Sequence, residues 1–335
     1  MGNNNLNKTI IITTVSVFSI TFWKSYWITM RPYLTFISGA AGLVGMAFIP
    51  DPDFIRTALA FIPLFLSYGF GQALTDCFQT DTDAISSPYR PLVKGLISVK
   101  QVLIVSLLGL LISISIMAYL NVVLIALGLP VVLGLLSYTK LKRTWWGGPP
   151  WNSWIVAMLP VMGRFTESGD ISSSPLFYYP YFTTPFILSL GAVFAGYANF
   201  VVMGYFKDIS ADRQTGYNTF PVVFGWKAAA IYSDIAAIVA ALSAGLAIAL
   251  LDGYSFISIA VYLAAFSINF YAQIKIHQIK DERLAHKPIG NVVRAFILYC
   301  MSIVISLKTG WLLSLLLYYA LFEISLRLRP ERTQV

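Results

Sequence analysis

Residues 182–213 read FTTPFILSLGAVFAGYANFVVMGYFKDISADR. The first part, residues 182–206, carries no charged side chain and is longer than the roughly 20 residues that a helix needs to cross a membrane. This apolar segment runs directly into Lys207, Asp208, Asp212 and Arg213. We therefore interpret the stretch as a transmembrane helix that carries two carboxylates and two cations to one membrane surface.

The composition extends this interpretation to the whole chain of 335 residues. Hydrophobic residues make up 57% and charged residues 11%, and the mean hydropathy is +0.72. A soluble domain is nearer half apolar and a quarter charged, so this chain has too little polar surface for a water-soluble globule. We predict an all-α fold, a polytopic integral membrane bundle of nine or ten helices. Candidate spans lie at about 33–50, 56–75, 101–118, 119–138, 152–163, 182–206, 226–250, 254–274, 292–307 and 310–326.

The same figures exclude disorder, a coiled coil and collagen, and two cysteines cannot form a disulfide framework. A pI near 9.3 would indicate nucleic acid as the partner of a soluble chain, but here we predict membrane lipid and no nucleic acid. We divide the chain into an N-terminal arm (1–32), a single transmembrane domain (33–326) and a basic tail (327–335). The arm contains a segment at 9–27 that is apolar but interrupted by Lys24, and we expect it to be an interfacial helix.

The distribution of Lys and Arg predicts the orientation. With ten spans, Arg56, Arg164 and Lys308 fall on one side of the membrane, and the other 20 of the 23 cations fall on the opposite side. Cytoplasmic loops carry the excess of Lys and Arg. We therefore predict a protein of the cell inner membrane whose two termini, and the loops after the second and sixth spans, face the cytoplasm.

Two acidic motifs follow apolar spans on this predicted cytoplasmic side. The first is residues 75–83, TDCFQTDTD, and the second is residues 207–213, KDISADR. If each helix continued through its motif, Asp76, Gln79 and Asp83 would share one stripe, and Asp208 and Asp212 would lie one turn apart. Facing each other, the stripes would form an acidic cup suited to Mg²⁺, which bridges carboxylates to substrate phosphates. Solvated loops whose charges pair with one another are the alternative.

At these residues the chain resembles the UbiA superfamily of intramembrane prenyltransferases. Residues 75–92, TDCFQTDTDAISSPYRPL, are similar to the first aspartate-rich motif of that superfamily, NDxxDxxxD, and its following xRP. Asp208 and Asp212 match the second motif, DxxxD, and residues 219–225, TFPVVFG, resemble TLPVxxG. The pair Arg31-Pro32 and residues 138–143, YTKLKR, resemble the RP and YxxxKR segments.

The resemblance implies a bundle around a central cavity, with a polyprenyl diphosphate bound through Mg²⁺ at the cytoplasmic mouth. It also implies transfer of the prenyl group to a hydrophobic or aromatic acceptor. The chain departs from the motif at Thr75, where the superfamily has Asn, and at Gln79, where it has Asp. The tenth span exceeds the usual nine.

The candidate site residues fall into three groups. As metal ligands we predict Asp76, Gln79, Asp83, Asp208 and Asp212. Diphosphate contacts are assigned to Arg31, Arg90, Lys94, Lys142, Lys207 and Arg213, although each of these cations also suits a positive-inside anchor. The pocket is expected to include Thr75, Gln79, Tyr197, Asn199 and Tyr205, and we count Tyr138 and Lys142 with the four aspartates as catalytic. Tyr138 also suits an interfacial belt, and Asn199 also suits a contact between helices.

Three functions remain open at this point. The first is Mg²⁺-dependent prenyl transfer to an aromatic or quinone-precursor acceptor. The second is cyclisation of the same prenyl diphosphate to a terpene. The third is transport or lipid binding without chemistry, although a transporter more often has acids within its spans than at one surface.

Overall fold

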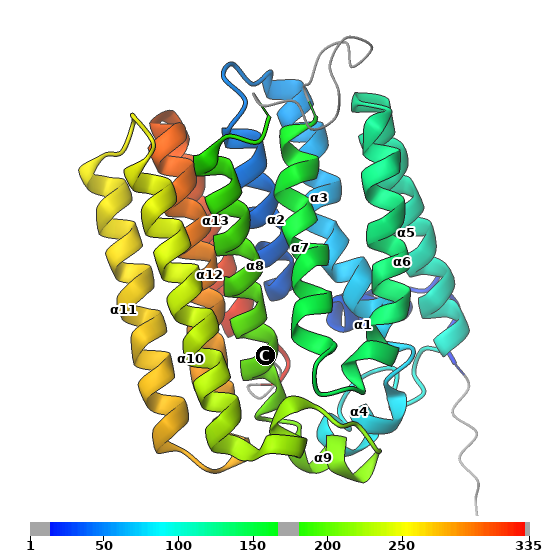
Figure 1. Ribbon diagram of the computed structural model, residues 1–335. Coiled ribbons are helices and arrows are strands. Elements are labelled where there is room, and N and C mark those ends of the chain that lie inside the picture. Colours follow the sequence, from blue (N-terminus) through cyan, green and yellow to red (C-terminus); the bar gives the residue numbers. More distant parts are fainter. Residues whose placement is uncertain (1–13, 167–180, 332–335) are drawn as a thin grey trace, which may run out of the picture.

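The computed structural model describes residues 14–166 and 181–331, and these residues form helices and no strand. Lys8, Arg332, the first part of the predicted interfacial segment and the end of the predicted tail lie outside the described residues. Ten longer helices occupy the ten predicted spans and run side by side (Figure 1). They are α2 (Pro32–Ala47), α3 (Phe54–Asp76), α5 (Val99–Leu120), α6 (Val123–Lys142), α7 (Gly148–Arg164), α8 (Thr184–Tyr205), α10 (Phe220–Ala249), α11 (Phe256–Gln278), α12 (His286–Leu307) and α13 (Leu312–Arg327). The predicted all-α membrane bundle is confirmed.

Eight of these helices are long and apolar enough to cross a membrane, while α2 and α7 have only 16 and 17 residues. Local sequence signals set several boundaries. Ser98 and Ser255 begin α5 and α11 with reciprocal capping boxes, and Asp53 accepts the backbone N–H of Arg56 at the start of α3. Within α10, Gly225 has a φ of 80°, which a residue without Cβ adopts readily and which kinks the helix after its first turn.

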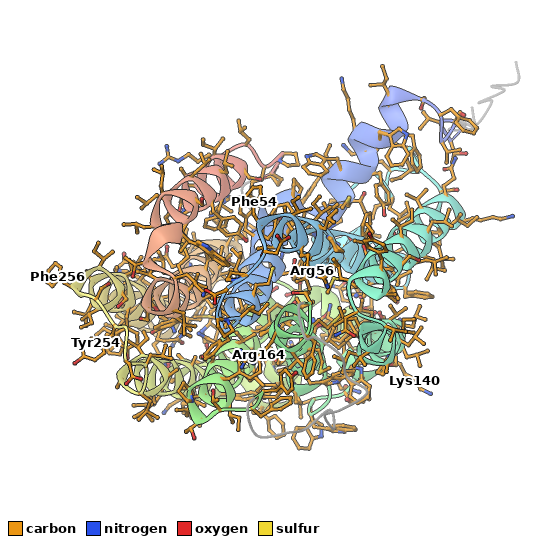
Figure 2. The ribbon with its side chains drawn as sticks, turned by 90° about the horizontal axis from the view of Figure 1, so that it is seen from above. Phe54, Arg56, Lys140, Arg164, Tyr254 and Phe256 are labelled. Atoms are coloured by element: carbon orange, nitrogen blue, oxygen red, sulfur yellow. The ribbon has the colours of Figure 1, made fainter. Side chains whose placement is uncertain are left out.

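The helices differ in how much of their surface meets other helices. The most apolar windows of α8 and α12 are 72% and 83% buried, whereas those of α5 and α13 are each 22% buried. Thus α8 and α12 form the interior of the bundle and α5 and α13 its periphery. Figure 2, which looks down on the bundle, shows the long helices nearly end-on.

Backbones of α2 and α7 approach closely because glycines line their crossing. A Cβ added at Gly45 would lie 1.8 Å from the carbonyl oxygen of Pro160, and one at Gly163 would lie 2.5 Å from that of Gly42. Small residues at a helix crossing maximise contact between backbones where no hydrophobic effect drives association. This crossing fixes α7 as one wall of the cavity described below.

Three shorter helices lie outside this parallel set. Helix α1 (Ile20–Met30) runs across the direction of the bundle, where Figure 2 shows it side-on at one edge. Its place at a membrane interface stays a prediction. Helices α4 (Thr80–Ser86) and α9 (Ile209–Gln214) lie beside each other at the lower end of the bundle in Figure 1.

The acidic motifs do not continue their preceding helices, so the predicted stripe through Asp76, Gln79 and Asp83 is wrong. Helix α3 ends at Asp76, and α4 begins after Gln79, whose φ and ψ are −126° and 17°. Helix α8 ends at Tyr205, and α9 begins after Asp208. The backbone turns after α3 and again after α8, so that both motifs pack across the end of the bundle instead of extending into solvent.

Candidate active site

The two motif helices are bound directly to each other. The hydroxyl groups of Thr82 on α4 and Thr215 at the end of α9 share a hydrogen bond of 2.8 Å. A second connection runs from the backbone N–H of Asn218 to the carbonyl of Arg143, which follows α6, at 2.9 Å. The acidic motifs are thus held against each other and against the end of α6, although no three acidic, histidine or cysteine side chains of the described residues gather closely enough to hold one metal ion.

Carboxylates of the first motif are buried and paired with arginines. One terminal nitrogen of Arg31 lies 2.9 and 3.0 Å from the two oxygens of Asp76, and the Gln72 amide donates to the same carboxylate at 2.7 Å. Arg90 pairs with Asp83 and lies 3.5 Å from Asp76. Arg31 reaches this position from a left-handed backbone with a φ of 52°, the one positive φ among the described residues other than glycine. A bulky residue adopts this conformation at a cost, which the paired guanidinium offsets.

The second motif retains one turn of regular geometry. The backbone N–H of Asp212 donates to the carbonyl of Asp208 at 2.7 Å, so the two acids lie one turn apart as predicted. Asp212 is fully buried, and its Oδ2 accepts the Thr219 hydroxyl at 3.0 Å. Its Oδ1 is buried and has no hydrogen-bond partner within the described residues. An unpartnered carboxylate oxygen beside a second acid is a suitable ligand for a hard divalent cation.

Burial also shifts the pKa values of two groups of the second motif. Burial raises the pKa of Asp212 to about 7, Lys142 opposes that rise, and Asp208 adds to it. Burial lowers the pKa of Lys207 to about 8, against the attraction of Asp208. A bound divalent cation would favour the ionised carboxylate of Asp212, because its charge exceeds that of any neighbouring side chain.

Lys142, at the end of α6, is bonded to Gln79 of the first motif. Its ammonium group donates to Gln79 Oε1 at 2.7 Å and lies over the rings of Tyr205 and Tyr217, at 5.9 and 5.4 Å from their centroids. Gln79 is thus buried and held by a cation at the cavity, although its backbone is not helical. Its amide can bind a cation through the carbonyl oxygen, with one formal charge less than a carboxylate.

A loop from the other half of the chain contacts the second motif. Glu282, in the short 3₁₀ helix η2 (Glu282–Leu284), accepts the backbone N–H of Ser210 at 3.0 Å and its hydroxyl at 2.6 Å. Ser210 lies between Asp208 and Asp212, so the connection between α11 and α12 supports α9. This contact is exposed and joins residues 72 positions apart, a spacing that no sequence motif marks.

A cavity of about 150 Å³ extends from the cup into the bundle. Eleven predicted site residues line it: Arg31, Thr75, Gln79, Asp83, Arg90, Tyr138, Lys142, Tyr197, Tyr205, Lys207 and Asp208. Deeper in the bundle its wall is largely aliphatic, with Leu110, Val131, Val156 and Leu159 among the lining residues. Tyr68, Gln72 and Asn152 also line it and were not predicted. The cavity joins a charged mouth to an apolar interior.

Five predicted residues do not line the cavity. Asp76 and Asp212 lie beside it, held as described above. Lys94 and Arg213 are exposed, which fits the alternative of cations at the membrane surface. Asn199 is buried among α8, α10 and α11, where its amide donates to Asn269 and accepts from Ser233 and Gln273. The pocket assignment of Asn199 is therefore corrected, because the residue faces away from the cavity and connects helices.

Paired carboxylates and buried cations at the mouth of an apolar cavity inside a membrane bundle suit an anionic ligand with a hydrocarbon part. The model of the UbiA prenyltransferase family matches residues 33–289. The chain belongs to this family, and the predicted prenyltransferase class is confirmed.

Curated relatives and solved structures agree with this assignment. The digeranylgeranylglyceryl phosphate synthase of Pyrococcus abyssi is 24% identical over 63% of this chain and 73% of its own length. That of Thermococcus kodakarensis is 23% identical over 79% of this chain and 91% of its own length. An apo UbiA homolog from Aeropyrum pernix K1 has a TM-score of 0.66 at 22% identity and covers 84% of this chain and 97% of its own. A UbiA homolog from Archaeoglobus fulgidus, bound to GPP and Mg²⁺, has a TM-score of 0.62 at 16% identity, covering 84% and 99%.

Proposed function

We propose that this protein transfers a polyprenyl group from its diphosphate to a hydrophobic acceptor inside the membrane, with Mg²⁺ as cofactor. The observation that carries the proposal is the meeting of Asp83, Asp208 and Gln79 with Arg90, Lys142 and Lys207 around one cavity mouth. Cations of this kind suit a diphosphate, and the aliphatic wall suits its prenyl chain. The bound GPP and Mg²⁺ of the Archaeoglobus fulgidus homolog support the same arrangement.

The chain's own residues account for the separate requirements of the reaction. Asp83, Asp208 and Asp212, with the carbonyl of Gln79, would hold Mg²⁺, which neutralises charge on the leaving diphosphate. Lys142, Arg90 and Lys207 would contact diphosphate oxygens directly and stabilise the charge that develops when the bond to the allylic carbon breaks. The apolar wall would exclude water from the allylic cation, and the ring of Tyr138, one turn before Lys142 on α6, would face it.

Two kinds of acceptor are open to this mechanism. The sequence predicts an aromatic or quinone-precursor compound. The names of the curated relatives support a lipid acceptor instead, because their product is digeranylgeranylglyceryl phosphate. We favour an alcohol of the second kind and keep the aromatic compound as the comparison.

The proposal includes the orientation and the membrane predicted from the cations. The mouth would face the cytoplasm of a cell bounded by an inner membrane, where a soluble diphosphate product can leave. A reporter fused after Val335 should score as cytoplasmic, since α13 returns the chain to the end that carries α4 and α9 (Figure 1). A reporter on the opposite side would contradict this orientation.

Purified protein in lipid nanodiscs provides the test of activity. It is incubated with geranyl, farnesyl or geranylgeranyl diphosphate and Mg²⁺, first without acceptor and then with geranylgeranylglyceryl phosphate or 4-hydroxybenzoate. We expect Mg²⁺-dependent diphosphate release and a prenylated product only when an acceptor is present. A cyclic hydrocarbon or alcohol formed without acceptor would indicate a terpene cyclase. No diphosphate release under any condition would indicate transport or lipid binding.

A further inference from the structure

Three polar side chains from three helices meet inside the cavity. The Tyr197 hydroxyl on α8 donates to the Tyr68 hydroxyl on α3 at 3.3 Å, and the Asn152 amide on α7 donates to the Tyr197 hydroxyl, also at 3.3 Å. All three residues line the cavity, and Asn152 also lies beside Tyr138. We call Tyr68, Asn152 and Tyr197 the Tyr–Asn–Tyr cluster.

The cluster lies deeper than the charged mouth. Tyr68 precedes Asp76 by eight residues on α3, which places it about 12 Å further along the helix at a rise of about 1.5 Å per residue. Tyr197 likewise precedes Tyr205 by eight residues on α8, two turns from its end. The near end of the cluster is Asn152, which lies beside Tyr138, one turn or about 6 Å before Lys142 on α6. The cluster therefore runs from the position of the first carbons of a bound prenyl chain deeper into the bundle.

Other hydroxyls of this part of the cavity are bonded differently. Ser67 donates to Leu64 of its own helix, and Ser38 donates to the carbonyls of Thr35 and Phe65. These serines are satisfied by backbone alone. The cluster instead links side chains of three helices at the surface of the cavity, and polar groups on an apolar wall are costly unless they meet polar partners.

The cluster offers hydroxyl and amide groups and no formal charge. The cations that line the cavity within the described residues, Arg31, Arg90, Lys142 and Lys207, belong to the mouth, and Arg31 is bound to Asp76. Neutral donors and acceptors bind a neutral polar group better than an anion, because an anion brought there would lose its hydration without a cationic partner.

We infer that the Tyr–Asn–Tyr cluster is the subsite for the reacting end of the acceptor, and that this end is an uncharged hydroxyl group. The inference rests on the proposed function and specifies its acceptor. Any anionic group of the acceptor would lie at the mouth among the cations, and its hydroxyl would be held by the cluster beside the donor chain. The hydroxyl oxygen would form the new bond to the allylic carbon, the bond from that carbon to the diphosphate would break, and the hydroxyl proton would pass to the released diphosphate. Tyr68, Asn152 and Tyr197 are then specificity-determining residues for the acceptor and contribute little to binding of the donor.

The test separates acceptor from donor. Tyr197→Phe and Asn152→Leu are prepared as full-length protein in nanodiscs, with Tyr262→Phe as the matched control. Tyr262 donates its hydroxyl to the carbonyl of Ala241 between α11 and α10, outside the cavity lining, so the control also loses one phenol hydrogen bond. The acceptor KM is measured with geranylgeranyl diphosphate and geranylgeranylglyceryl phosphate. Donor affinity is measured separately with geranylgeranyl S-thiolodiphosphate, an analogue that resists cleavage.

We expect both cluster variants to raise the acceptor KM by about tenfold or more, while the affinity for the thiolodiphosphate changes less than twofold. The control should change neither value by more than twofold. An unchanged acceptor KM, or an equal loss of donor affinity, would overturn the subsite while leaving prenyl transfer by the wild type intact. Absence of transfer by the wild type to either acceptor would overturn the proposed function, and the subsite with it.

Discussion

Helix α8 carries polar side chains on two sides within the membrane. One side lines the cavity, and the other is enclosed by hydrogen-bond partners from neighbouring helices. Towards the cavity, Tyr197 takes part in the Tyr–Asn–Tyr cluster. On the other side, Asn199 binds Ser233 at 2.7 Å, and Asn269 and Gln273 at 3.1 Å each. Ser233 and Gln273 are also bonded to each other at 2.9 Å. Two residues apart, one polar group faces a space for a ligand and the other is enclosed by its partners.

An intramembrane polar residue can have a structural or a functional role, depending on what completes its hydrogen bonds. A polar group in an apolar medium must be bonded, but its partner can be protein or ligand. Asn199 and its three partners are all buried and satisfy one another, so they contribute to helix association. The cluster around Tyr197 is bonded internally yet still lines the cavity. Substitutions on the enclosed side should therefore change stability, and those on the cavity side should change catalysis.

The largest effect on turnover is expected at Asp208, which follows α8 at the mouth of the cavity. Asp208 lines the cavity, and its carboxylate makes no capping hydrogen bond to α9, so Asp208→Asn should remove charge from the Mg²⁺ site without loss of packing. We expect Mg²⁺-dependent turnover to fall by about 10²–10³-fold, which is typical for loss of a preorganised electrostatic contact. Asp81→Asn is the control, because Asp81 is exposed and pairs with Arg143 at 3.2 Å. Wild-type turnover in the Asp208 variant would remove this residue from the metal site.

On the enclosed side, Asn199→Leu should cost stability instead. The change leaves Ser233, Asn269 and Gln273 without their shared partner, and an unpaired buried polar group costs about 1–3 kcal/mol. Unfolding by SDS titration measures this loss, and activity per folded molecule should stay within twofold of the wild type. Ser115→Ala, which removes only a bond to the carbonyl of Leu111 on the same exposed helix face, is the control. Lost activity with unchanged stability would reinstate Asn199 as a pocket residue.

A charge added at the mouth tests the departure from the superfamily motif. Gln79→Glu keeps the reach of the side chain toward Lys142 and places a carboxylate where the superfamily has Asp. Since close charges at a shielded site interact by a few kcal/mol, Mg²⁺ should bind about tenfold more tightly. Gln278→Glu is a matched control, because Gln278 also accepts a lysine ammonium, that of Lys275 at 3.0 Å, but is exposed. Weaker Mg²⁺ binding would show that the neutral amide is required at this position.

The smallest effect should come from outside the cavity. Glu282→Ala removes the contact with Ser210, and we expect the Mg²⁺ concentration for half-maximal rate to rise by about two- to fivefold, because exposed charged contacts contribute little. Asp252→Ala, at the exposed turn after α10, is the control. A loss as large as that at Asp208 would mean that Glu282 has a direct role in the site.

The sequence was sufficient for the spans and for most of the mouth, because both depend on local composition. Apolar length predicts a helix wherever it occurs, and the aspartates and cations are recognisable at helix ends. The turns at Gln79 and Asp208 were not predictable, because contacts between distant segments cause them. Lys142 binds Gln79 across 63 positions, and Thr82 meets Thr215 across 133. A single sequence contains no signal for such pairings.

The sequence also did not show which face of a helix lines the cavity. Helices α8 and α12 are buried on nearly all sides, so apolar periodicity does not mark one face as the cavity. Asn199 was assigned to the pocket because it precedes the second motif on the same helix, and apolar periodicity could not correct that assignment. Tyr68 and Asn152 were overlooked because a tyrosine and an asparagine in apolar spans resemble interfacial or helix-packing residues.

The hydrogen bond between Thr82 and Thr215 joins two motifs that the ribosome synthesises at different times. Chain growth at about 5–20 residues per second separates the emergence of these two threonines by roughly 7–27 s. During that interval the first acidic motif has no second motif beside it. The arginines that pair with its carboxylates are nevertheless synthesised early, since Arg31 precedes Asp76 and Arg90 follows Asp83 by only seven positions. The nascent amino-terminal half can thus pair its own carboxylates with arginines before the second acidic motif is synthesised.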